Sequence, residues 1–80
     1  MGKDSNIVHQ YFKKEADGST ILIRLNPIQL KVTEITLLKD TLPELRELDV
    51  DPEILEDLKA DGFHDASPLE FNLYLSGLAG

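Results

Sequence analysis

The chain has 80 residues, of which 41% are hydrophobic and 29% are charged, and its formal charge at pH 7 is −7. This length fits one domain, since typical domains hold about 100–150 residues. The acidic excess argues against general binding to nucleic acid or anionic membranes, which needs clustered cations, and the absence of cysteine excludes disulfides and thiolate chemistry.

The start of the chain is polar. Residues 1–6 predict a disordered N-terminus, followed by a single small α+β domain over residues 7–80. No apolar run reaches the roughly 20 residues of a membrane-spanning helix. A secretory signal has a basic flank followed by an apolar stretch, and residues 1–10 lack this pattern. We therefore expect a cytoplasmic protein.

The N-terminal third of the chain predicts a β-hairpin. Residues 7–12 are rich in strand-forming residues, and residues 20–25 alternate between two faces in the way that a strand does. Asp17-Gly18 between them suits the positive φ angles of a tight hairpin turn. We therefore predict an antiparallel hairpin over residues 7–25.

The segment after the hairpin allows two interpretations. Asn26-Pro27-Ile28-Gln29 has the pattern of a helix start, with an acceptor side chain followed by proline at the first helical position. A helix over residues 27–39 would be apolar on two sides. A strand is favoured by the β-branched residues Val32, Thr33, Ile35 and Thr36. The capping pattern favours the helix, and the strand is the alternative.

Three further helix starts are expected in the second half. Thr41-Leu42-Pro43-Glu44 has the pattern of a capping box, and leucines follow at a spacing of three. Asp51-Pro52-Glu53 opens a helix that ends at Gly62, with Phe63 folding back onto it. Ser67-Pro68-Leu69-Glu70 opens a last helix, which runs through residue 78.

These elements predict an α+β fold in which an N-terminal antiparallel β-hairpin is followed by three or four short helices. If residues 27–39 form a strand, the alternative is a three-stranded antiparallel sheet covered by three helices.

Few residues have the pattern of a catalytic or metal site. His64 lies between Asp61 and Asp65 and close to Ser67, but there is no glycine-flanked nucleophile turn and no full set of metal ligands. We therefore predict that the protein is not an enzyme and has no catalytic residues, cofactor or metal.

The last helix is apolar around most of its circumference. Either it is the centre of the fold, or one side of it contacts another protein. Acidic residues are concentrated elsewhere, because residues 34–61 hold ten of the fifteen acids and only three of the eight cations. The sequence thus predicts an apolar C-terminal helix and an acidic helical surface.

The resulting functional hypothesis is a small protein-interaction module that binds a second copy of the chain or another protein. The candidate contact residues are Phe71, Tyr74, Leu75, Leu78, Glu44, Glu47, Glu53 and Glu56. The alternative is a nucleic-acid-related regulator, which would act through the hairpin cations Lys13, Lys14 and Arg24 or by acidic mimicry of nucleic acid.

Overall fold

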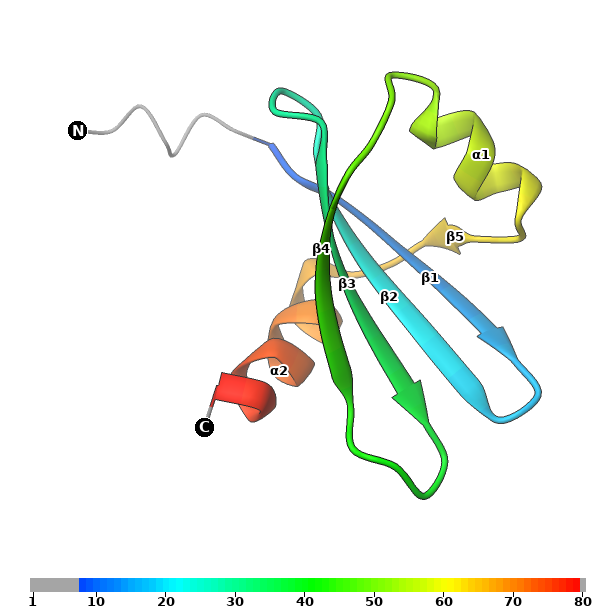
Figure 1. The fold of residues 1–80 in the computed structure, drawn as a ribbon, viewed down its shortest axis with the longest axis vertical. Coiled ribbons are helices and arrows are strands. Elements are labelled where there is room, and N and C mark those ends of the chain that lie inside the picture. The colour runs from blue at the N-terminus through cyan, green and yellow to red at the C-terminus, as the bar shows by residue number, and fades with distance from the viewer. Residues whose placement is uncertain (1–7, 80) are drawn as a thin grey trace.

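The structure, a computed structural model, describes the backbone of residues 8–79 and the side chains of residues 8–77. The predicted disordered segment, residues 1–6, lies outside the described residues. Within the described part the strands are β1 (Gln10–Ala16), β2 (Ser19–Asn26), β3 (Lys31–Leu38), β4 (Glu44–Asp49) and β5 (His64–Asp65), and the helices are α1 (Ile54–Ala60) and α2 (Pro68–Ala79) (Figure 1).

The strands form one antiparallel sheet with the order β4-β3-β2-β1-β5. The hairpin predicted for residues 7–25 is present as β1 and β2, over residues 10–26, and residue 7 lies outside the described residues. Its turn residues Asp17 and Gly18 have φ angles of 46° and 81°. Two consecutive positive φ angles match the right-handed twist of the flanking strands, which explains why Asp-Gly occupies this turn.

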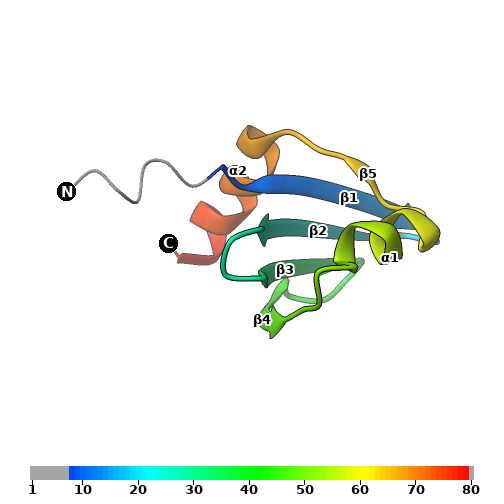
Figure 2. The ribbon, with the colours of Figure 1, turned by 90° about the horizontal axis from the view of Figure 1, so that it is seen from above.

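The sheet is buried on both faces, and each face is covered by a different helix (Figure 2). The α1 face, defined here by its packing against Leu58 of α1, carries Phe12, Ile23, Leu25 and Val32. The α2 face, which packs against Phe71 of α2, carries Leu22 and Ile35. Neighbouring residues of β2 are therefore buried on opposite faces, which is why residues 21–23 are all apolar.

The prediction of a hairpin followed by three or four helices is wrong, because the described residues form a five-stranded sheet and only two helices. The alternative with three strands and three helices is wrong for the same reason, although its strand within residues 27–39 is confirmed as β3. Two predicted helices, over residues 27–39 and from Thr41 onward, are the strands β3 and β4.

The capping pattern at Asn26 serves a turn and not a helix. The Asn26 side-chain oxygen accepts hydrogen bonds from the N–H groups of Ile28 and Gln29, each at 3.0 Å. Leu30 then has a φ angle of 55°, which is incompatible with a continuing helix. The chain reverses direction here and continues as β3. The same side-chain-to-backbone bonds occur at helix starts and in tight turns, so the pattern alone does not separate the two.

The predicted capping box at Thr41 is part of the β3–β4 loop. The Thr41 N–H and hydroxyl donate to the Leu38 carbonyl, each at 3.4 Å, and Asp40 has a φ angle of 67°. The leucines spaced by three do not form a helical stripe, because Leu45 and Leu48 lie on opposite faces of β4.

We predict that Asn26→Ala lowers the free energy of unfolding by about 1 kcal/mol, because two turn N–H groups lose their acceptor. Chemical denaturation measures this loss. Asn26→Asp keeps an acceptor oxygen and is the matched control, so it should retain most of the stability. Equal losses in the two variants would contradict the role of the side-chain oxygen.

The two remaining helix predictions are confirmed in outline. α1 ends as expected, because Phe63 donates its N–H to the Leu58 carbonyl at 2.9 Å and Gly62 has a φ angle of 95°. Its start differs, since Glu53 is the N-cap residue and no side chain caps it. α2 begins at Pro68, with the Ser67 hydroxyl accepting the N–H of Leu69 at 3.0 Å. Neither helix is long and apolar enough to span a lipid bilayer.

Candidate interaction surface

The candidate surface is built around α2, which is anchored to the sheet by Phe71. This side chain is fully buried, with a relative exposure of 0%. Its ring contacts the ring of Tyr11 edge to face at a centroid distance of 5.6 Å, and the Arg24 guanidinium lies 5.3 Å from its centroid. The buried side of α2 is thus fixed by one aromatic residue and its neighbours on β1 and β2.

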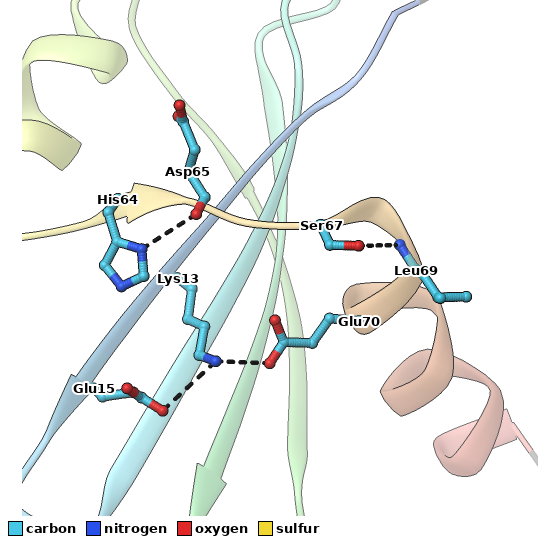
Figure 3. A network of polar contacts seen from close by, with 7 residues as sticks. All are labelled: Lys13, Glu15, His64, Asp65, Ser67, Leu69 and Glu70. Atoms are coloured by element: carbon cyan, nitrogen blue, oxygen red, sulfur yellow. Dashed lines mark hydrogen bonds and ion pairs between the residues drawn. The ribbon is translucent and has the colours of Figure 1, made fainter.

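A second attachment is an ion pair at the N-terminal end of α2 (Figure 3). The Lys13 Nζ donates to Glu70 Oε2 at 2.8 Å and lies 3.6 Å from Glu15 Oε2. The hydrogen bond to Glu70 is the main reason that the pKa of Lys13 is raised above its ordinary value of 10.5, and partial loss of hydration opposes this rise. α2 is therefore held by charge as well as by packing.

The raised pKa of Lys13 predicts alkaline sensitivity. A cation whose pKa is raised by folding stabilises the folded state fully below pH 10.5, and this contribution disappears as the pH rises through the folded-state pKa. In denaturation experiments from pH 9 to 12, wild type should therefore lose more stability than Lys13→Met. Lys39→Met, which removes an exposed cation in the β3–β4 loop, is the control and should follow wild type. Parallel curves for all three proteins would contradict the prediction.

A groove of about 470 Å³ lies between the outer side of α2 and the β3–β4 loop. Its lining residues define the α2–β4 groove, and they are Leu42, Pro43, Leu73, Tyr74 and Gly77. The relative exposures are 85% for Leu42, 65% for Leu73 and 42% for Tyr74. Three large apolar side chains thus face water at a single concave site.

Leu45 extends this apolar surface onto β4. The strand register places it beside Ile35, which in turn lies beside Leu22 on the α2 face. Ile35 and Leu22 are covered by Phe71, whereas Leu45 is left half exposed. α2 therefore covers the middle of its face and leaves the β4 side open.

β4 is an edge strand, and its outer backbone groups have no strand partner among residues 8–79. Val50 donates its N–H to the Leu30 carbonyl at 3.0 Å, and this pair continues the β3–β4 register. Hydrogen-bonded pairs alternate with non-bonded pairs in an antiparallel ladder. The residues that direct their backbone groups toward β3 are thus Glu44, Arg46 and Leu48. Those that direct theirs away from the sheet are Leu45, Glu47 and Asp49.

The charged side chains of this strand are mainly acidic, since β4 contains Glu44, Glu47 and Asp49 but a single cation, Arg46. That cation is already paired within the sheet, because Arg46 Nη2 and Nε donate to Glu34 Oε1 at 2.7 and 3.1 Å. The open edge of β4 therefore presents negative charge.

The apolar contact residues predicted from the sequence are divided by the structure. Phe71 is in the core, and Leu75 packs against the same cluster. Tyr74 lines the groove. The side chain of Leu78 lies outside the described residues. The outward side of α2 is instead formed by Leu69 and Leu73.

The predicted acidic contact residues are all exposed, but they do not form a helical surface. Glu44 and Glu47 belong to β4, and their side chains point to opposite faces of the sheet. Glu53 directly precedes α1, and only Glu56 lies within a helix. The predicted acidic helical surface is therefore wrong, because these acids are divided between β4, the residue before α1, and α1 itself.

His64 and Ser67 have local structural contacts (Figure 3). One His64 ring nitrogen lies 3.2 Å from the Asp65 carbonyl oxygen, and the Ser67 hydroxyl caps α2. Within residues 8–79 no three His, Asp or Glu side chains are grouped so that they could hold a metal ion.

The hairpin cations do not form one patch. Lys13 and Arg24 lie on the α2 face, where they contact Glu70 and Phe71. Lys14 lies on the α1 face, with its ammonium 5.8 Å from the Phe63 ring centroid. Strand alternation thus separates the cations that are adjacent in sequence.

Comparisons of the chain with protein-family models, with curated proteins and with solved structures gave no match.

Sequence reasoning missed the groove residues Leu42 and Pro43 and the half-exposed Leu45. The spacing of Leu42 and Leu45 predicts one stripe of a helix, whereas Leu42 lies in the β3–β4 loop and Leu45 lies on the edge strand. The sequence signal for the exposed apolar surface was the breadth of the apolar surface on α2, since Leu69 and Leu73 lie opposite the buried side of this helix.

Proposed function

We propose that this protein is a cytoplasmic protein-interaction module that binds another protein at the α2–β4 groove. We propose that it is not an enzyme. The observation that supports the proposal is the meeting of Leu42, Leu73 and Tyr74 around a concave apolar site while the core is filled by other residues.

Covering this groove would be energetically favourable. Burial of a leucine side chain is worth about 1.5–3 kcal/mol relative to leaving it in water. Tyr74 adds an aromatic ring with a polar end, a residue type enriched at protein interfaces. A partner that fills the groove therefore gains apolar contacts with little rearrangement of the sheet.

The acidic residues from β4 to α1 support a basic partner. Glu44, Glu47, Glu53 and Glu56 are all exposed, and Glu44 and Glu47 belong to the open edge strand itself. Charges at the rim of an interface affect association rate and partner choice more than affinity. The proposed partner thus combines an apolar contact with positive charge.

Site-specific photo-crosslinking tests the proposal. A photoreactive phenylalanine analogue replaces Leu73 in the groove or Ile28 in the β2–β3 turn, two positions with similar exposures of 65% and 69%. In lysate from the native source, position 73 should give a discrete crosslinked product that position 28 does not give. Leu42→Asp, on the other wall of the groove, should remove that product while the fold is retained by circular dichroism.

Equal crosslinking from both positions, or a product that persists in Leu42→Asp, would reject the groove as the binding site. A product with twice the mass of the chain would identify a second copy as the occupant and would contradict a different partner protein.

A further inference from the structure

We infer that the partner supplies an extended, positively charged segment, which joins the sheet beside β4 as an additional antiparallel strand. This inference rests on the proposed function and specifies the kind of partner that the groove and its adjacent sheet edge accept.

The backbone of β4 has outward N–H and carbonyl groups with which such a strand can pair. The outward N–H and carbonyl groups belong to Leu45, Glu47 and Asp49, and the strand is exposed along its six residues. An extended segment that pairs with an exposed edge obtains main-chain hydrogen bonds without a change in the host sheet. Pro43, which has no N–H, marks one end of the accessible edge.

The side chains of the same three residues determine which sequence fits. Because Leu45, Glu47 and Asp49 alternate with the inward-directed residues, their side chains all lie on the α2 face, where the groove is located. Directly opposite residues of an added strand project to that face as well. The matching segment therefore has an apolar residue opposite Leu45 and basic residues opposite Glu47 and Asp49.

Charge complementarity favours a cationic segment over other extended chains. Arg46 is held by Glu34 through two hydrogen bonds, so it does not neutralise the acids of β4 for an approaching partner. Lys31 Nζ lies 3.8 Å from Asp49 Oδ1, but both side chains are well exposed, and such a pair is weak in water. The edge keeps its negative charge.

A second copy fits this edge poorly. Antiparallel pairing of two β4 strands around Glu47 places two glutamates directly opposite each other, and pairing around Arg46 does the same with two arginines. Pairing around Leu45 puts Pro43, which has no N–H to donate, opposite an outward-directed residue. The strand is thus better matched to a different chain.

The experiment is an NMR titration of the full 80-residue chain with the blocked peptide Lys-Val-Lys-Thr-Leu-Lys. In antiparallel orientation this peptide places lysine opposite Asp49, Glu47 and Glu44, and leucine opposite Leu45. We expect saturable shifts at the amides of Leu45, Glu47 and Asp49. The matched peptide Glu-Val-Glu-Thr-Leu-Glu should bind at least about tenfold more weakly, because like charges are then directly opposite.

Three variants at position 47 separate strand addition from simple occupation of the groove. Glu47→Pro removes one outward N–H and should weaken peptide binding at least about tenfold, whereas Glu47→Ala keeps the N–H and should retain more of it. Glu47→Lys should reduce the preference for the basic peptide. No binding at millimolar peptide, equal binding of both peptides, or unchanged binding in Glu47→Pro would overturn the inference.

The outcome for the proposed function is separate. If the crosslinked product from position 73 persists in Glu47→Pro, the groove binds a partner without strand addition, so the proposed function stands and this inference fails. If the product is absent from wild type, the proposed function itself fails.

Discussion

Replacing Leu48 by proline should destabilise the protein far more than replacing its neighbour Glu47 by proline. The ladder between β3 and β4 directs the N–H of Leu48 toward Val32, whereas the N–H of Glu47 points away from the sheet. Proline at 48 removes a hydrogen bond between the strands and places its ring against β3. We expect a loss of about 1–3 kcal/mol from the unsatisfied partner alone.

Alanine variants measure the effect of losing each side chain, which is subtracted from the effect of the proline substitution. The difference between Leu48→Pro and Leu48→Ala measures the backbone effect at the inward position, and Glu47→Pro against Glu47→Ala measures it at the outward position. The second difference should be within about 1 kcal/mol of zero, because proline is tolerated at edge positions whose N–H faces water. Urea denaturation of the four variants gives both values. Equal differences would show that the assignment of outward groups on β4 is wrong.

Phe71→Ala should produce the largest loss among side-chain truncations. Phe71 is fully buried, and it links α2 to Leu22 and Ile35 of the sheet. Removal of such a ring costs about 3–5 kcal/mol, from lost burial and from the cavity that is left. Native domains are stable by only about 5–15 kcal/mol, so this loss is a large share of the total.

The matched control for Phe71→Ala is Leu73→Ala, two residues further along the same helix. Leu73 is 65% exposed, so its truncation should change stability by no more than about 0.5 kcal/mol. Phe71→Leu retains most of the volume and should have an intermediate effect, which is measurable even if the alanine variant is unfolded. A comparable cost at positions 71 and 73 would contradict the orientation of α2.

The extent to which the sequence predicted the fold depended on where each signal was satisfied. Three signals act through neighbouring residues, and the predictions from them were correct. They are the Asp17-Gly18 turn, the end of α1 near Gly62 and the start of α2 at Ser67. Asn26 also makes the hydrogen bonds expected of it, but they close a turn. Whether the chain then forms a helix or a strand is decided by pairing with β2, which is a long-range property.

The candidate site was only partly predictable for a similar reason. The apolar character of α2 was evident from the sequence, but its side chains were not distinguished until packing showed Phe71 buried and Leu73 outward. The other wall of the groove depends on the β3–β4 loop, whose residues were assigned to a helix. The acids of β4 were recognised from the sequence. Their alternation between the two faces of a sheet edge could not be predicted, because these residues were assigned to a helix.

The charge on the open side of β4 also bears on self-assembly. An exposed strand with free backbone groups is a template onto which further copies add, and this is the route by which sheets grow into fibrils. Glu44, Glu47 and Asp49, together with Pro43, oppose such growth without closing the edge. The domain can thereby keep hydrogen-bonding capacity available in crowded solution, at the cost of accepting only chains that bring the opposite charge.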